Sequence, residues 1–249
     1  MQLITSSRRR LCGLILGGLG GFGLLLVTDL IQIQARPGGE WMADAAELTV
    51  PEGTPVTSFD FEKEDLGKWR VLEGQWAVEE MPDAPSSKRV LIQRADRNAF
   101  NVIITPAGAF YRAAIDISVK IKPLSGSEDA SGGIVFRFAE GKYYVVRAHA
   151  RENNVRLYYY DGNKQHMLVT ANVQPLALRR WHTIRVVAVG DQIQGWLDGQ
   201  ILIDYEDMRS LVRTDPRLEE GEVGLWTKAD SVTAFDDFII RGYRTAPSR

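Results

Sequence analysis

Residues 113–122 read AAIDISVKIK, and this stretch decides the fold class. Every second side chain is apolar and those between are mostly polar, which is the pattern of an antiparallel strand with one buried face. Similar short runs recur from Phe59 to Arg241, and several are separated by turn dipeptides: Asp161-Gly162, Gly190-Asp191 and Asp198-Gly199. The spacing predicts an all-β sandwich of two antiparallel sheets.

The composition excludes several classes of protein. The 249 residues carry 30 Lys and Arg against 32 Asp and Glu, a formal net charge of −2. There is no basic excess to neutralise a row of phosphates, so we expect no nucleic-acid partner. A single cysteine excludes an intrachain disulfide framework and any metal site built from several cysteines.

The N-terminus has the composition of a targeting segment. Arg8, Arg9 and Arg10 precede residues 11–27, which carry no charged side chain. A basic stretch followed by an apolar run is typical of a secretory signal, so we expect an exported protein, whether periplasmic, secreted or at the cell surface. Twin-arginine export and an uncleaved anchor over residues 11–33 are open alternatives, and this segment is the only expected contact with a membrane.

Three segments are expected along the chain. Residues 1–35 form the signal peptide or anchor, and residues 36–55, rich in proline and glycine, form a linker. Residues 56–245 form the β-sandwich domain.

Basic and aromatic side chains gather on three neighbouring strands. Short connections join the strands at 134–138, 143–150 and 155–160, so we expect a meander within one sheet. Alternation turns one set of side chains outward: Arg137, Tyr143, Arg147, His149, Arg156, Tyr158 and Tyr160. Rings supply contact area and guanidinium groups supply forked donors, so this patch suits a flat ligand with hydroxyl or carboxylate groups. An ordinary solvated sheet face is the alternative.

Two tryptophans fall on the polar side of later strands. Trp196 and Trp226 are expected to be shielded by a ligand, a partner or a loop of the chain, because a tryptophan is seldom left in water. Trp226 and its neighbour Lys228 join the predicted ligand-binding set.

Several motifs together resemble one family. They are SFDF at 58–61, GKW at 67–69, GQW at 74–76, GGIVFRF at 132–138, YYVVRA at 143–148, WHTIRV at 181–186, LDGQ at 197–200, GEVGLWTKADS at 221–231 and FDDF at 235–238. From about Val56 to Arg244 the chain is similar to the 3-keto-disaccharide hydrolase domain family of the concanavalin A-like lectin/glucanase superfamily, which is related to the β-sandwich domain of exo-inulinase. The resemblance implies a jelly roll whose first and last strands pair.

Candidate catalytic and metal-binding groups are few. The paired carboxylates of family 16 glycoside hydrolases are absent from the sequence, and His149 is the only catalytic candidate on the proposed face. Asp236 and Asp237 are adjacent on a strand, so they point to opposite faces and cannot form an acid and base pair. One of them is expected to cap a loop or to hold a structural Ca²⁺; no other cofactor is expected.

Three functions follow from these features. The leading hypothesis is an exported carbohydrate-binding domain without a catalytic pair, with a glycan as its partner. The first alternative, implied by the resemblance, is a glycoside hydrolase or lyase that acts on 3-keto-disaccharides. The second is a structural surface domain that binds another protein.

Overall fold

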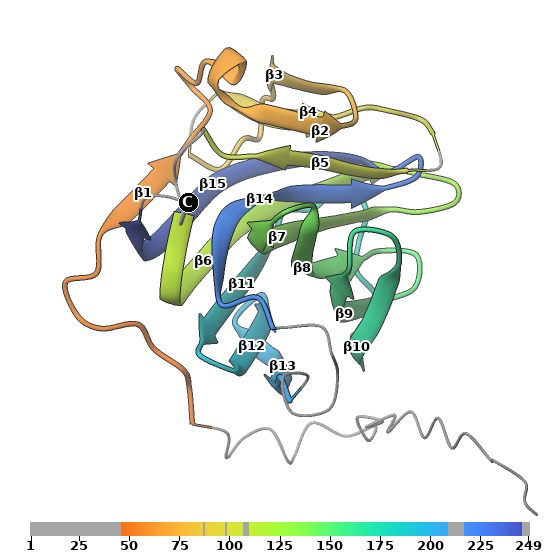
Figure 1. Cartoon of the computed structure of the whole chain (residues 1–249). Helices are drawn as coiled ribbons and strands as arrows, with labels where there is room; N and C mark the ends of the chain where they lie inside the picture. The colour runs from red at the N-terminus through yellow and green to blue at the C-terminus, as the bar shows by residue number, and fades with distance from the viewer. Residues whose placement is uncertain (1–45, 87, 98, 107–109, 209–216, 246–249) are drawn as a thin grey trace, which may run out of the picture. The chain divides into compact units, whose positions relative to one another are not determined.

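The computed structural model describes residues 46–245 apart from residues 87, 98, 107–109 and 209–216 (Figure 1). The predicted targeting segment and residues 36–45 of the predicted linker lie outside the described residues. In the part of the chain that is described, no helix is both long and apolar enough to cross a bilayer. That part holds fifteen β-strands and one 3-10 helix, Leu66–Lys68, so the all-β prediction is confirmed.

The strands form two antiparallel sheets, joined where Glu220 and Gly221 pair with Arg112 and Tyr111. Sheet A has the order β13-β12-β11-β6-β15-β4-β3, and β1 also pairs with β15. Its strands are β1 (Val56–Phe59), β3 (Trp76–Glu80), β4 (Arg89–Gln93), β6 (Phe110–Ser125), β11 (His182–Val189), β12 (Gln192–Leu197), β13 (Gln200–Glu206) and β15 (Val232–Thr245). The pairing of the first strand with the last, expected from the family resemblance, is confirmed.

Sheet B has the order β10-β9-β8-β7-β14-β5-β2. Its strands are β2 (Arg70–Glu73), β5 (Phe100–Ile104), β7 (Ser131–Ala139), β8 (Lys142–His149), β9 (Asn154–Tyr160), β10 (Gln165–Asn172) and β14 (Glu220–Lys228). In Figure 1 this sheet runs from β2 and β5 through β14 and β7 to β8, β9 and β10. The predicted meander is confirmed, because β7, β8 and β9 are consecutive neighbours.

The main core lies between the two sheets. Alternate side chains of both sheets meet there, among them Ile117 and Phe235 of sheet A and Phe136 and Tyr144 of sheet B. The rings of Phe136 and Tyr144 stack with their centroids 5.3 Å apart. This packing uses one face of each sheet and leaves the opposite, outer faces for other roles.

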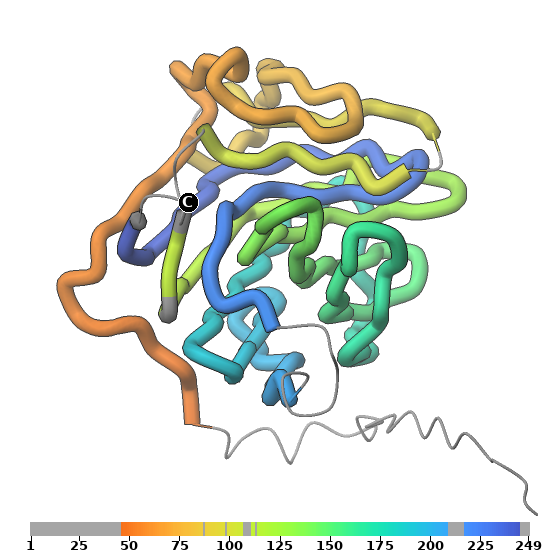
Figure 2. Tube along the Cα trace, in the orientation of Figure 1, coloured from red at the N-terminus to blue at the C-terminus, as the bar shows by residue number. Residues whose placement is uncertain are grey.

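The described end of the predicted linker lies against the outer face of sheet A. Residues 46–55, here called the strap, contain no helix or strand and run along the outside of the sandwich to β1 (Figure 2). Leu48 N donates to Gln194 Oε1 (2.7 Å), and Gln194 Nε2 donates back to Ala46 O (3.0 Å). At the other end, Gly242 N donates to Pro55 O (3.1 Å).

Candidate functional site

The outer face of sheet B carries a second apolar cluster. Strand alternation places these side chains opposite the main core: Val102, Ile104, Val135, Phe138, Tyr143, Val145 and Trp226, with Phe100, Tyr158 and Tyr160 packed at the edge. Trp226 is only 1% exposed. We call this set the aromatic cluster. Strands β5, β7 and β8 are therefore apolar on both faces.

The ring contacts show that sheet B is curved. Phe100 on β5 and Tyr160 on β9 have ring centroids 5.7 Å apart, although β14, β7 and β8 lie between their strands. Strands are spaced about 4.8 Å apart, so a flat sheet would separate these two by about 19 Å. Two further ring contacts link these residues. The Trp226 and Phe100 ring centroids are 5.8 Å apart, and those of Tyr143 and Tyr160 are 5.0 Å apart. The outer face of sheet B is therefore concave, and aromatic side chains fill the concavity.

A charged cluster lies beside these rings. Arg147 Nη2 donates to Glu152 Oε2 (3.1 Å), and Arg156 Nη1 lies 2.9 Å from the same oxygen. Both arginines also donate to the hydroxyl oxygen of Tyr158, at 3.3 and 3.1 Å. We call Arg147, Glu152, Arg156 and Tyr158 the arginine–glutamate cluster. Its two cations and one anion leave a net positive charge.

The arginine–glutamate cluster combines one buried side chain with side chains that are partly exposed to solvent. Arg147 is buried and donates to Asn154 Oδ1 (2.6 Å), whereas the Glu152 side chain is 45% exposed. Burial alone would raise the pKa of Glu152, but hydrogen bonds from Asn154 and Arg147 outweigh it, so the pKa is lowered and the carboxylate is charged at neutral pH. No described residue accepts a hydrogen bond from Arg156 Nη2. A ligand can therefore reach one charged acceptor and one charged donor side by side.

Most of the predicted ligand-binding residues share this face. Tyr143, Arg147, Arg156, Tyr158 and Tyr160 lie on β8 and β9 in adjacent register positions, and Trp226 contacts the rings from β14. Lys228 pairs with Phe100 in register at the end of β14. Tyr143 and Trp226 are nearly buried by the other rings, and burial raises the pKa of Tyr143 well above its usual range.

The prediction that Arg137 faces outward is wrong. The pairing of β7 with β8 shifts between Phe136 and Ala139, and Arg137 has a φ of 53°. Its guanidinium is buried, donates to the carbonyl oxygens of Leu218 (3.1 Å) and Gly190 (2.8 Å), and lies 5.9 Å from the Tyr144 ring of the main core. A bulge reverses the facing of the side chains that follow it, and strict alternation does not foresee a bulge.

His149 is not open to a ligand either, which corrects its placement on an accessible face. The side chain is 2% exposed, and both ring nitrogens are engaged. Nδ1 accepts from the backbone N–H groups of Arg151 (3.1 Å) and Glu152 (3.2 Å), and Nε2 lies 3.2 Å from Asp129 Oδ2. The structure gives the ring a role in holding a turn, and we carry no catalytic role for it forward.

Asp236 and Asp237 are held by other parts of the protein. Asp236 is buried and accepts from Ser86 N (3.2 Å) and Ser86 Oγ (3.1 Å), which is the loop-capping role; burial raises its pKa. Asp237 pairs with Lys120 at 2.7 Å. Among the described residues, no three His, Cys, Asp or Glu side chains converge as metal ligands. The structural Ca²⁺ stays a prediction, and the described residues supply no set of ligands for it.

Two important residues were not predicted. Glu152 lies in the turn between β8 and β9, and Phe100 lies at the first position of β5. Only strand positions entered the predicted patch, so a turn residue was overlooked. The signal was available, because the turn of a meander places its side chains at the edge of the face that the two strands form.

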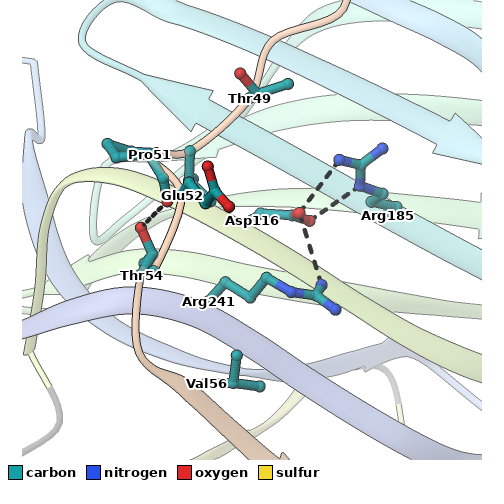
Figure 3. Close-up of a pocket in the computed structure, with 10 residues that line it drawn as sticks. Thr49, Pro51, Glu52, Thr54, Val56, Asp116, Arg185 and Arg241 are labelled. Atoms are coloured by element: carbon teal, nitrogen blue, oxygen red, sulfur yellow. Dashed lines mark hydrogen bonds and ion pairs between the residues drawn. The ribbon is translucent and has the colours of Figure 1, made fainter.

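The outer face of sheet A also carries a tryptophan, arginines and a carboxylate, but there these side chains contact other groups of the same chain. Trp196 is buried, and the guanidinium of Arg185 on the neighbouring strand lies 4.7 Å from its ring. The tryptophan is shielded as predicted, but the group over its ring is a side chain of the same sheet. A pocket of about 320 Å³ separates the strap from Asp116 and Arg241 (Figure 3). Asp116 accepts from Arg185 Nε (3.0 Å) and pairs with Arg241 (3.7 Å), so most of the charge at this pocket is neutralised internally.

Comparison with known proteins defines the class and then the family. The fold is a jelly-roll sandwich of the concanavalin A-like kind, as predicted. Residues 55–241 match the family described as 3-keto-alpha-glucoside-1,2-lyase-like domain, so the chain belongs to that family. No curated protein sequence gives a significant match to the chain.

Solved structures share the fold at low sequence identity. A carbohydrate-binding module, CBM66 from Bacillus subtilis, is 18% identical, with a TM-score of 0.57 over 70% of this chain and 96% of the module. A protein of unknown function with a galectin-like fold from Bacillus subtilis is 13% identical, with a TM-score of 0.58 over 75% of this chain and 94% of its own. A putative glycosyl hydrolase from Parabacteroides distasonis is 13% identical, with a TM-score of 0.51 over 76% of this chain and 94% of its own.

Proposed function

We propose that this protein binds a glycan on the outer face of sheet B, at the arginine–glutamate cluster. The observation that carries the proposal is the position of Glu152, whose half-exposed carboxylate lies 2.9 Å from Arg156 Nη1. A charged acceptor next to a charged donor matches two neighbouring hydroxyl groups of a sugar, each of which can donate and accept.

The neighbouring rings suit the apolar side of the same ligand. Tyr158 and Tyr160 lie on β9 beside Arg156, and both are partly exposed. An aromatic face provides contact area for the C–H groups of a sugar ring. The structural likeness to a carbohydrate-binding module supports this proposal at the level of the fold.

Family membership favours a second candidate, the cleavage of a 3-keto-disaccharide. Elimination from a 3-keto sugar removes the proton next to the ketone and protonates the leaving oxygen, so it requires a base and an acid. Glu152 is charged and could serve as the base. The described part of this face offers no free second carboxylate next to Glu152, so binding stays the leading proposal.

Export is proposed on the sequence alone. The arginines before residues 11–27 support passage through the membrane, and the same segment would be the only membrane contact if it is not cleaved.

The test is calorimetric titration of the full-length protein with disaccharides, polysaccharides and 3-keto-disaccharides, with product analysis of each mixture. Glu152→Gln and Arg156→Ala are each expected to weaken binding at least about tenfold, because each removes a charge-assisted hydrogen bond. Glu47→Gln, an exposed glutamate of the strap, is the matched control and should bind as the wild type does. Equal affinity in all variants would place the site elsewhere; turnover would favour the enzyme, and no binding would favour a protein partner.

A further inference from the structure

The turn that carries Glu152 is fixed by a buried histidine. His149 Nδ1 accepts the backbone N–H groups of Arg151 and Glu152, so one ring nitrogen holds two successive residues of the turn. Arg151 Nη1 ties the same turn to Gly126 O (3.3 Å). The position of the Glu152 carboxylate therefore depends on His149, which does not itself touch the exposed face.

The hydrogen bonds determine where the imidazole carries its proton. Two N–H donors point at Nδ1, so that nitrogen is unprotonated and the proton is on Nε2, facing Asp129. Burial would raise the pKa of Asp129, but hydrogen bonds from His149, Ser131 and Ser231 outweigh it and lower the pKa. Asp129 is therefore a charged acceptor, and it lies 3.2 Å from Nε2, where the donors at Nδ1 place the proton.

We propose that His149 is a proton-sensitive positioning residue, which presents Glu152 to the glycan when neutral and releases the turn when protonated. A second proton can be taken up only at Nδ1, where a new N–H would face the two backbone donors. The turn would then have to open, and Glu152 would leave Arg147 and Arg156. This inference rests on the proposed glycan site for its functional consequence.

The charged groups around the ring act in opposite directions. Asp129, on the loop before β7, favours the protonated ring. The Glu152 carboxylate also favours the protonated ring, whereas Arg147 on β8, which pairs with that carboxylate, offsets its charge. The Arg151 guanidinium donates to Gly126 O. The two backbone N–H groups oppose protonation most directly, because they need Nδ1 as an acceptor.

The experiment measures the turn without any sugar. Amide hydrogen exchange of Arg151 and Glu152 is followed by NMR in the full-length protein at about pH 7.5 and about pH 5, and corrected for the intrinsic effect of pH on exchange. Protection of both amides is expected to fall at least about tenfold on acidification, as two hydrogen bonds are lost. His149→Asn offers an uncharged acceptor at the position of Nδ1 and should show no such fall. His166→Asn removes a histidine that pairs with Asp161 on another turn and is the matched control.

Equal protection at both pH values in the wild type, or the same fall in His149→Asn, would overturn the inference. Asp129→Asn gives an independent check if His149→Asn does not fold. Without the carboxylate the ring is harder to protonate, so the fall in amide protection should move to lower pH. A shift of this fall to higher pH would contradict the inference. Where a glycan binds, its affinity should fall at least about tenfold over the same range in the wild type and stay constant in His149→Asn. If no glycan binds, the proposed function fails, while the amide exchange still decides the role of His149.

Discussion

The outer faces of the two sheets contain similar residues with different surroundings. Each has a buried tryptophan and arginines paired with a carboxylate. On sheet A the carboxylate is Asp116, which is buried between two arginines at the pocket that separates it from the strap. On sheet B it is Glu152, which is half exposed between Arg147 and Arg156. The comparison teaches that residue type alone does not mark a binding face; what matters is whether a charged pair has an open side.

The largest expected effect is the difference in stability loss between variants of the two tryptophans. Trp226 is the centre of the aromatic cluster, so Trp226→Ala should lower the free energy of unfolding by about 3–5 kcal/mol. Trp196 is buried but belongs to none of the apolar clusters of the described residues, and a guanidinium lies over its ring, so Trp196→Ala should cost less, about 1–2 kcal/mol. Urea denaturation of both variants measures the difference. An equal cost would mean that the two faces are packed alike.

Removal of the arginine on sheet A should have the next largest effect. Arg185→Ala leaves the buried Asp116 with only the more distant Arg241, and we expect a loss of about 2–3 kcal/mol, less than for a fully buried pair because Arg185 is partly exposed. Asp116→Asn in the same background should recover part of the loss, as it removes the uncompensated charge. If Arg185→Ala alone has no effect on urea denaturation, the internal neutralisation of this face is wrong.

Acid should weaken the loop next to the sheet B site. Burial would raise the pKa of Asp230, but the carboxylate accepts from Ser127 Oγ (2.6 Å) and from the backbone N–H groups of Ser127, Glu128 and Asp129. These hydrogen bonds outweigh burial and lower its pKa far below the usual range. A lowered pKa in the folded state means stability that is present above the unfolded value, about 3.9, and lost as the pH falls below it.

Asp230→Asn tests whether this carboxylate causes the loss of stability in acid. It should cost about 1–2 kcal/mol at neutral pH and flatten the loss of stability below about pH 4. Asp96→Asn, at an exposed aspartate, is the control and should retain the wild-type acid profile. An unchanged profile in Asp230→Asn would show that other carboxylates govern the acid response. Thermal denaturation over a pH series gives both results.

The smallest effect is expected at the strap. Glu47 pairs with Arg185 at an exposed position, so Glu47→Gln should change the free energy of unfolding by less than about 0.5 kcal/mol. The backbone hydrogen bonds to Gln194 hold the strap without this ion pair. A large loss in urea denaturation would show that the pair, and not the backbone, fastens the strap.

The sequence predicted the features that depend on alternation. The two-sheet sandwich and the β7-β8-β9 meander follow from period-two patterning, and the family resemblance supplied the pairing of β1 with β15. The prediction for Arg137 was wrong because a bulge at residues 136–139 turns its side chain inward, and a bulge leaves no signature in the apolar pattern.

The site itself was only partly predictable. The strand positions Arg147, Arg156 and Tyr158 were found, because alternation assigns their face. Glu152 was missed because its role depends on the turn, and His149 was misplaced because its burial depends on a contact with Asp129 from a distant loop. Such contacts arise from the packing of loops at the end of a sandwich, for which the local sequence carries little information.

The most direct test of the account is to map a bound glycan onto the two faces. Backbone chemical shifts of the full-length protein are recorded during titration with the sugar that binds best in calorimetry, for the wild type and for Glu152→Gln. The account predicts shifts confined to residues 147–158 and their neighbours on sheet B, and their loss in Glu152→Gln. Shifts centred on Asp116 and the strap, or unchanged shifts in Glu152→Gln, would contradict it.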